Sequence, residues 1–235
     1  MDSVTLVAHL IDIVVRLYLI YLLLGGFVRS YVILFLYCLT YLLTSFSEVV
    51  VAQLKGRASA FYGNLYWTDE VLLDMLLFFT VIFLTYRATE GNAVLRPVMR
   101  KALIIAVAAA LILPFALGGL TLIDAKDHSK LDGHWFNRAG QIFNFGGALM
   151  NLFLWTALLS SKRRDPRLLA VSAGLGVAVT AQAIFLGVRL LSGSPNVREV
   201  ADLFNVLGQI TASVIWCWAF RPSAQVRSGA TSSGY

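Results

Sequence analysis

The sequence predicts an all-α, polytopic membrane protein built as a single bundle of seven transmembrane helices. Hydrophobic residues make up 58% of the 235 residues and charged residues only 14%, and the mean hydropathy is +0.75. A soluble core of this length could not bury so much apolar surface. The chain also contains seven apolar runs of roughly the 20 residues that a helix needs to cross a bilayer, and it lacks the short alternating segments of a membrane β-barrel.

Each predicted span is justified by its length and by the polar residues that bound it. The seven cover residues 4–27, 31–52, 66–88, 102–123, 141–161, 168–192 and 202–220. The first is interpreted as a helix and not as a signal peptide, because it has no basic start and no Ala-x-Ala-like cleavage site. Pro114 predicts a kink in the fourth, and glycine pairs in the fifth and sixth predict close helix packing. Residues 1–220 are therefore expected to form one domain, and the Ser-, Gly- and Ala-rich residues 221–235 a disordered cytoplasmic tail.

The distribution of Lys and Arg predicts the orientation. With Arg87 and Arg189, which lie near span ends, counted with the adjacent loops and Arg16 left aside, eleven of these residues lie on the side of the loops after the first, third and fifth spans and of the tail, and seven lie on the other side. Most acids assigned to loops, Asp69 among them, accompany the seven. Because cytoplasmic loops carry the excess of positive charge, the N-terminus is expected outside and the C-terminus inside. Trp67, Trp135, Trp216 and Trp218 lie near span ends, as is typical of rings anchored at headgroup level.

Charged and polar residues inside the spans mark the candidate site. His9, Asp12 and Arg16 are spaced three and four apart, so they share one helix face, and Asp12 can pair with Arg16. Asn137, Gln141, Asn144 and Asn151 form a polar stripe along the fifth span. The other polar residues expected to share one outward-opening region are Glu48, Glu70, Asp74, Gln182, Arg189, Asn205 and Gln209.

Two interpretations of these residues stay open. Asp12, Arg16, Glu48, Asp74 and Arg189 can form an internal network of ion pairs that fixes helix packing, because polar groups in a membrane interior must find one another. Alternatively, the polar residues line a water-accessible pocket or path for a small ligand, an ion or a proton.

Enzymatic and cofactor functions lack their usual residues. The chain has no HExxH, GxSxG or P-loop motif, His9 is the one histidine in a span, and residues 202–220 hold no lysine for retinal. His128 and His134, with the acids between the fourth and fifth spans, could hold an outer-surface metal, but a plain solvated loop is the simpler interpretation. Cys38 and Cys217 both fall in spans, which predicts neither a disulfide nor a metal motif. No cofactor and no enzymatic activity are expected.

Three further features carry a resemblance to a known group. They are the Tyr66-Trp67-x-x-Glu70 opening of the third span, Arg138 near the start of the fifth, and the Asn205 to Trp218 stretch with its Ile-Trp-x-Trp end. With them the chain resembles a family of uncharacterised bacterial integral membrane proteins with seven helices, a rhodopsin-like topology without the retinal lysine. The resemblance implies the inner membrane of a bacterial cell and adds Trp67 and Arg138 to the candidate site.

The expected function is that of a non-enzymatic sensory or small-ligand-binding membrane protein with a polar pocket in the outer half of the bilayer. Its expected partners are the lipid bilayer, a small molecule or ion, and an inner-membrane or cytoplasmic protein that docks on the basic inner loops; nucleic acid is not expected. The alternative is a transporter or a subunit of a proton- or ion-coupled channel, in which Asp12, Glu48, Glu70 and Asp74 act as carriers.

Overall fold

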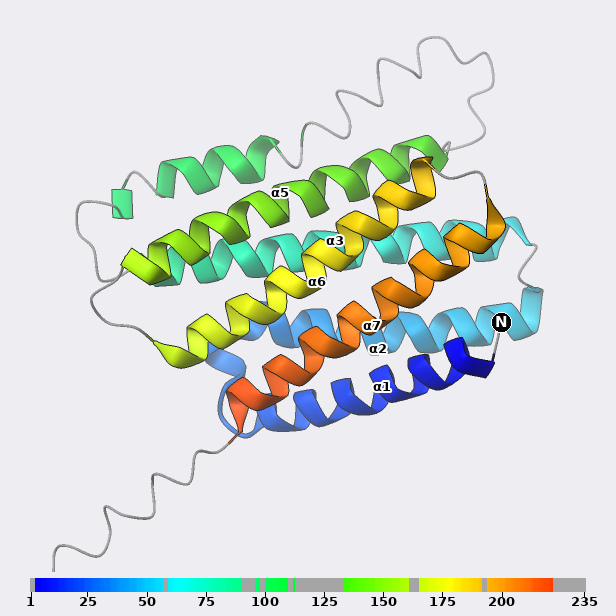
Figure 1. Cartoon of the computed structure of the whole chain (residues 1–235), viewed down its shortest axis with the longest axis horizontal. Helices are drawn as coiled ribbons and strands as arrows, with labels where there is room; N and C mark the ends of the chain where they lie inside the picture. The colour runs from blue at the N-terminus through cyan, green and yellow to red at the C-terminus, as the bar shows by residue number, and fades with distance from the viewer. Residues whose placement is uncertain are drawn as a thin grey trace, which may run out of the picture.

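Long α-helices make up the computed structural model, which describes residues 3–56, 59–89, 96–97, 100–109, 112, 133–160, 165–191 and 194–221. Side chains are described in these ranges except for residues 3–6, 133–138, 157, 160, 189–190, 195–196 and 198–199. The elements are α1 (Ser3–Leu24), the short 3-10 helix η1 (Val28–Ser30), α2 (Val32–Lys55), α3 (Ala60–Ala88), α5 (Gly133–Ser160), α6 (Pro166–Leu191) and α7 (Pro195–Phe220). The all-α prediction is confirmed (Figure 1).

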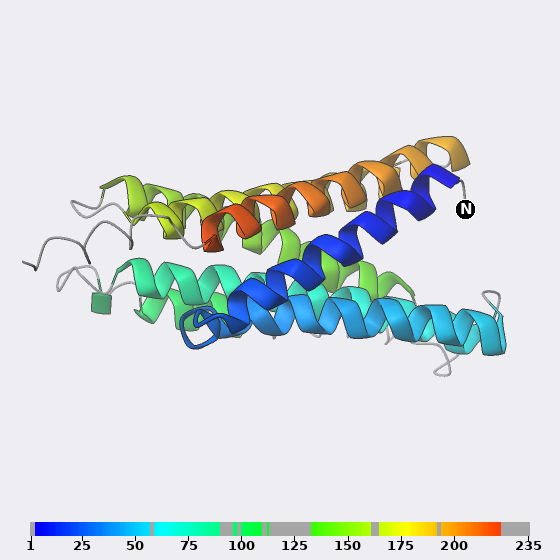
Figure 2. The same cartoon turned by 90° about the horizontal axis from the view of Figure 1, so that it is seen from below.

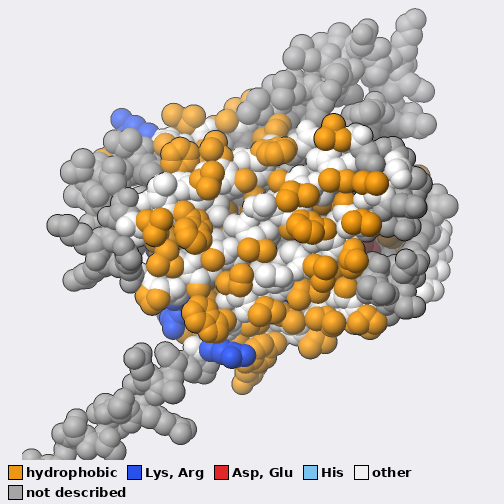
Figure 3. All heavy atoms as spheres, viewed as in Figure 1, with side chains coloured by type: hydrophobic (Ala, Val, Ile, Leu, Met, Phe, Trp, Pro, Cys, Tyr) orange, Lys and Arg blue, Asp and Glu red, His pale blue; other side chains and the backbone are white. Residues whose placement is uncertain are grey.

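Five of these helices are long and apolar enough to cross a membrane. The candidate spans are Val7–Leu24, Val32–Lys55, Ala60–Ala88, Pro166–Val188 and Val200–Phe220. Large apolar side chains such as Val14, Phe46 and Leu149 are exposed on the helix surfaces, and Figure 3 shows hydrophobic side chains spread over one whole face. Such a surface is suited to lipid. Association with a membrane is thus supported, whereas seven spans and the orientation of the termini stay predictions.

Three helices, α3, α5 and α7, begin well before their predicted spans. α3 begins at Ala60 because the Ser59 hydroxyl accepts a hydrogen bond from the backbone N–H of Tyr62 at 3.2 Å, which is an N-cap. α7 begins at Pro195, a residue suited to the first helical turn. A hydropathy window misses such polar first turns. Asp69, which the charge count grouped with the loop acids although it lies within the predicted span 66–88, is a buried residue of α3.

The structure describes only part of the fourth predicted span and of the predicted tail. In the fourth predicted span, residues 102–109 and 112 are helical, and its remainder lies outside the described residues. The predicted tail lies outside them as well, except for Arg221.

The helices form two layers that α1 connects. α6 packs along α7 and α2 along α3, while α5 contacts both α3 and α6. α1 crosses diagonally between the layers: it lies beside α7 where it begins, and it runs toward the start of α2 where it ends (Figure 2). Below, the N end of the bundle is the end where α1, α3 and α7 begin, and the C end is the end where they finish.

The largest apolar core lies toward the C end. It contains the last turns of α1, the first turns of α2 and α6, and the second half of α7, with Leu23, Leu34, Leu84, Leu154 and Phe220 among its buried residues. Trp216 lies in this core with no exposed surface, and its indole Nε1 donates to the carbonyl oxygen of Val171 at 3.0 Å. The expectation of a headgroup-level ring is therefore wrong for Trp216, because a gap on α6 admits the indole, whereas Trp218 is 66% exposed.

Gly174 supplies that gap, and replacing it is expected to destabilise the fold. A Cβ added at Gly174 would collide with Nε1 of Trp216, so Gly174→Ala displaces the indole and is expected to cost about 1–3 kcal/mol, as overpacking does. Gly187→Ala on the same helix is the control, since its added Cβ meets nothing within 4 Å. Thermal unfolding of the purified protein in detergent measures both. Equal melting temperatures for the two variants would contradict the close approach.

Candidate functional site

A buried ion pair occupies the middle of α1. Nε of Arg16 lies 3.0 and 3.1 Å from the two carboxylate oxygens of Asp12, as the four-residue spacing predicts. The Asp12 side chain is 1% exposed and the Arg16 side chain 0%. Both charges are thus withdrawn from solvent and require compensation from the protein.

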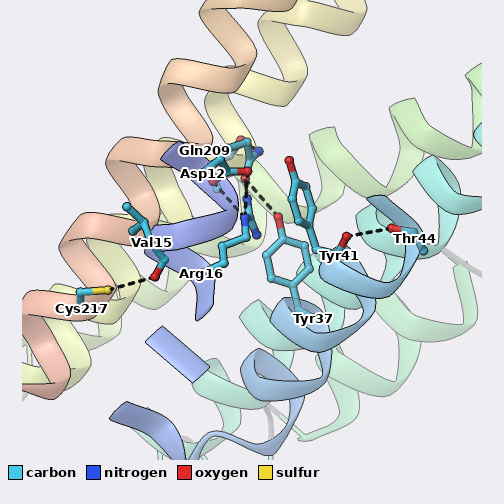
Figure 4. A network of polar contacts seen from close by, with 9 residues as sticks. Asp12, Val15, Arg16, Tyr37, Tyr41, Thr44, Gln209 and Cys217 are labelled. Atoms are coloured by element: carbon cyan, nitrogen blue, oxygen red, sulfur yellow. Dashed lines mark hydrogen bonds and ion pairs between the residues drawn. The ribbon is translucent and has the colours of Figure 1, made fainter. Parts of the chain in front are cut away.

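Hydrogen bonds connect Arg16 to three more helices (Figure 4). Its Nη2 donates to Oε1 of Gln209 on α7 at 3.2 Å, and the hydroxyl of Tyr37 on α2 donates to the same oxygen at 3.0 Å. The amide nitrogen of Gln209 in turn donates to the carbonyl oxygen of Ala178 on α6 at 3.4 Å. One side chain, Gln209, therefore joins the ion pair to α2, α6 and α7.

Aromatic rings complete the surroundings of the guanidinium. Cζ of Arg16 lies 3.5 Å from the ring centroid of Tyr41 and 5.4 Å from that of Tyr37. Such cation–π contacts are strongest where water is excluded. We call Asp12, Arg16, Tyr37, Tyr41 and Gln209 the Arg16 network. It links α1 to both layers at the place where α1 crosses between them.

Four acidic residues lie nearer the N end of the bundle. Glu48 on α2 interacts electrostatically with Asp69 and Glu70 on α3, and Glu70 does so with Asp74. We call these four residues the carboxylate group. Gln182 Nε2 donates to Oε1 of Glu70 at 3.0 Å.

The depth of this group follows from helix geometry. Gln182 is four residues beyond Ala178, the partner of Gln209, so the contact between Gln182 and Glu70 lies about 6 Å, one helical turn, nearer the N end than the Arg16 network. The carboxylate group therefore extends from about the depth of Arg16 toward the N end.

Three buried acceptor atoms toward the N end have no hydrogen-bond partner in the part of the chain that the structure describes. Two belong to the carboxylate group, Oδ2 of Asp69 and Oδ2 of Asp74, and the third is Oδ1 of Asn205, four residues before Gln209 on α7. The Asp74 side chain is 4% exposed, and the backbone of α5 approaches it closely, because a Cβ added at Gly140 would lie 3.0 Å from its Oδ2. A buried acceptor without a donor costs roughly 1–3 kcal/mol, so each of these atoms is suited to a donor from water or a ligand.

The polar stripe predicted on the fifth span divides between two places. Asn144 is buried near Asp74, and its side-chain nitrogen donates to the carbonyl oxygen of Gly140 at 2.9 Å. Asn151 lies farther toward the C end, where its Oδ1 accepts from the hydroxyl of Ser172 on α6 at 3.2 Å. Asn151 therefore serves helix packing and does not join the carboxylate group.

The remaining predicted site residues contact neither the Arg16 network nor the carboxylate group in the interactions given above. His9, Trp67 and Gln141 are half-buried on their helices, and the ring of Trp67 lies edge-on to Tyr66 with centroids 5.5 Å apart. The side chains of Asn137, Arg138 and Arg189 lie outside the described residues, as do His128 and the side chains of His134 and Trp135. Within the described ranges, no group of three or more His, Cys, Asp or Glu residues could hold a metal.

Sequence reasoning missed two members of the Arg16 network. Tyr37 and Tyr41 lie four residues apart on α2 and so share one face. Two aromatic rings on one face can form cation–π contacts with an arginine of a neighbouring helix. The sequence interpretation instead grouped Glu48 and Asp74 with Arg16, but the contacts of Arg16 described above are to Asp12, Gln209 and the two tyrosines.

Arginines and aromatic rings hold the helix ends together at the C end. Nη1 of Arg87 donates to the carbonyl oxygen of Ser30 at 2.8 Å, and Nε of Arg167 donates to that of Ala219 at 3.2 Å. The Tyr31 ring centroid lies 5.0 Å from Cζ of Arg87 and 4.9 Å from the Phe220 centroid, and Arg167 also interacts electrostatically with Tyr31. Burial raises the pKa of Tyr31, whereas the two nearby arginines act in the opposite direction. Figure 3 likewise shows Lys and Arg at this end of the bundle.

The chain matches no protein-family model, no curated protein and no solved structure. The resemblance based on Tyr66, Trp67, Glu70, Arg138 and the Asn205 to Trp218 stretch therefore stays a prediction. The function has to be argued from the residues themselves.

Proposed function

We propose that the protein is a non-enzymatic membrane protein that binds a small ligand among the carboxylate group, in the half of the bundle nearest the N end. The observation that carries this proposal is the set of three buried acceptors without donors, on Asp69, Asp74 and Asn205. Ionisable residues inside membrane proteins face the bundle interior and mark ligand or ion sites.

The chemistry of these atoms defines the ligand class. All three are acceptors, and Glu48 and Glu70 add two more carboxyl groups near Asp69 and Asp74. A ligand with a positive charge or several N–H donors, such as a small protonated amine, complements such a region. An anion would be repelled by it.

The position of the Arg16 network supports a sensory role. Arg16 contacts α2 and α7, which belong to different layers, about one turn below the contact between Gln182 and Glu70. A ligand that bound both α3 and α7 would favour one distance between the two layers at the Arg16 network. Binding that favours one conformation over another shifts the equilibrium toward it. Arg29, Arg87, Arg167 and Arg221 at the C end are consistent with a cytoplasmic orientation of that end, where a protein partner would read the change.

A thermal-shift experiment tests ligand binding. Putrescine, a diamine with donors at both ends, is expected to raise the melting temperature of the detergent-purified protein, whereas sodium acetate is not. At a hundredfold its Kd a ligand stabilises the folded state by about 2.7 kcal/mol. Asp69→Asn is expected to weaken this stabilisation while the melting temperature without ligand stays near that of the wild type.

Asp202→Asn is the matched control, because it removes one negative charge from an exposed side chain on α7. It is expected to respond to putrescine as the wild type does. Equal shifts with putrescine and acetate, or equal losses in both variants, would argue against a site at the carboxylate group.

A transporter or proton-coupled channel subunit is the second candidate function. The observation that favours it is Asp74, a carboxyl group near the middle of a candidate span with one oxygen lacking a donor among the described residues. Intramembrane carboxyl groups of this kind serve as proton relays in pumps and transporters. Glu70 and Glu48 continue the series of carboxyl groups toward the N end.

A further inference from the structure

An apolar groove lies between α1 and α7 near the C end. Its volume is about 400 Å³, and Val14, Tyr18, Val214, Trp218 and Arg221 line it. Pockets for small molecules and cofactors have similar volumes, roughly 300–1,000 Å³. The groove lies on the outside of the bundle and is separate from the carboxylate group.

The groove exists because α1 leaves α7 as it crosses to the other layer (Figure 2). Its floor is the contact between Sγ of Cys217 and the carbonyl oxygen of Val15, 3.7 Å apart (Figure 4). Toward the C end Phe27, in the turn after α1, contacts Phe220 at the end of α7, with ring centroids 5.4 Å apart. The result is an apolar depression that is open to the outside of the bundle.

The rims of the groove face the region that lipid occupies around a membrane protein. Val14 and Trp218 are 64% and 66% exposed, and Val214 and Tyr18 are also exposed. Both flanking helices are candidate spans. An acyl chain is the apolar, flexible group that such a depression can hold without exposing these side chains to water.

Arg221 gives the groove a charged end. It is the first residue after α7, its side chain is exposed, and it is the one charged side chain among the described residues that line the groove. A guanidinium at the end of a candidate span can form paired hydrogen bonds with a lipid phosphate. The aromatic rings of Trp218 and Tyr18 are of the type that lies at headgroup level.

We propose that this groove binds one anionic phospholipid, with an acyl chain along Val14 and Val214 and the headgroup phosphate at Arg221. Charge complementarity favours this occupant over a second copy of the chain, because a copy would have to bring its own anion to Arg221. The lipid comes from the leaflet at the C end. A site of this kind fixes the angle between α1 and α7 through an occupant that is not part of the chain.

Native mass spectrometry of the full chain with defined lipids tests the proposal. The first molecule of phosphatidylglycerol is expected to bind about fivefold more tightly than phosphatidylcholine with the same acyl chains, which is the effect of roughly one basic residue at a membrane surface. Arg221→Gln is expected to abolish this preference. Arg29→Gln, which removes an exposed arginine of η1 at the same end, is expected to keep it.

A second pair of variants tests the apolar part of the groove. Val214→Phe fills it and is expected to weaken binding of both lipids. Val200→Phe makes the same exchange at an exposed position of α7 outside the groove and is expected to leave binding unchanged.

Three results would overturn the proposal. Equal affinity of the wild type for the two lipids would mean that the groove holds only unspecific boundary lipid. A dimer that Val214→Phe dissociates, with lipid binding unchanged, would assign the groove to a second copy. A marked rise in the binding of both lipids after removal of residues 222–235 would assign it to that segment of the chain.

Discussion

Arg16→Met is expected to lower the free energy of unfolding by about 3–5 kcal/mol, the typical effect of removing one partner from a buried ion pair. The substitution leaves the Asp12 carboxylate, 1% exposed, without its cation. It also removes the donor to Gln209 and the cation over Tyr41. Because these contacts connect α1 to both layers, the loss acts on the packing of the whole bundle. Reversible unfolding in mixed detergent micelles measures it.

A double variant shows how much of the lost stability comes from leaving the Asp12 carboxylate unpaired. Asp12→Leu combined with Arg16→Met replaces the ion pair by apolar side chains, which in other proteins is often neutral or stabilising, and the bond from Tyr37 to Gln209 can persist. Most of the lost stability is therefore expected to return. Leu17→Met, at the neighbouring exposed position of α1, controls for the methionine. A double variant no more stable than Arg16→Met would show that the network contributes more than charge compensation.

If the double variant is stable and still responds to putrescine, the Arg16 network is an internal packing device, as one of the two sequence interpretations holds. If the double variant is stable but putrescine no longer raises its melting temperature, the Arg16 network takes part in binding. Its charges are then needed for the ligand and not for the fold. The double variant thus decides between the two interpretations.

Local spacing made part of the site predictable from the sequence. The pair Asp12 and Arg16 follows from a four-residue interval on one helix, and hydropathy alone identifies α1 as a helix long and apolar enough to cross a membrane. Hydropathy also placed the end of α3 at Ala88, where the structure has it. These features depend on residues that are close in the chain.

Contacts between distant helices were not predictable in the same way. Tyrosines in a span are equally typical of membrane interfaces, so Tyr37 and Tyr41 gave no reason to be assigned to Arg16 until α1 was seen to cross toward α2. Trp216 near the end of a span likewise resembles an interfacial anchor. Its burial depends on Gly174 of another helix, a pairing that neither segment reveals by itself.

Neutralising Asp74 is expected to abolish proton movement if the second candidate function is correct. Asn has nearly the shape of Asp but can neither take up nor release a proton, so Asp74→Asn interrupts the series of carboxyl groups at its deepest member. The wild type, reconstituted in vesicles with an internal pH-sensitive dye, is then expected to pass protons when a potassium diffusion potential is applied. The variant is expected to match empty vesicles.

The fold of Asp74→Asn is expected to survive, because Oδ2 of Asp74 has no described donor to lose and Gly140 leaves room for an atom of the same size. Asp165→Asn is the matched control: it also removes one negative charge, but Asn preserves the cap that Asp165 forms with the N–H groups of Arg167 and Leu168. A folded Asp74→Asn protein that still passes protons would exclude Asp74 as a carrier. A wild type that passes none, yet is stabilised by putrescine, would leave ligand binding as the function that the carboxylate group supports, since the same buried acceptors would then hold a ligand without moving an ion.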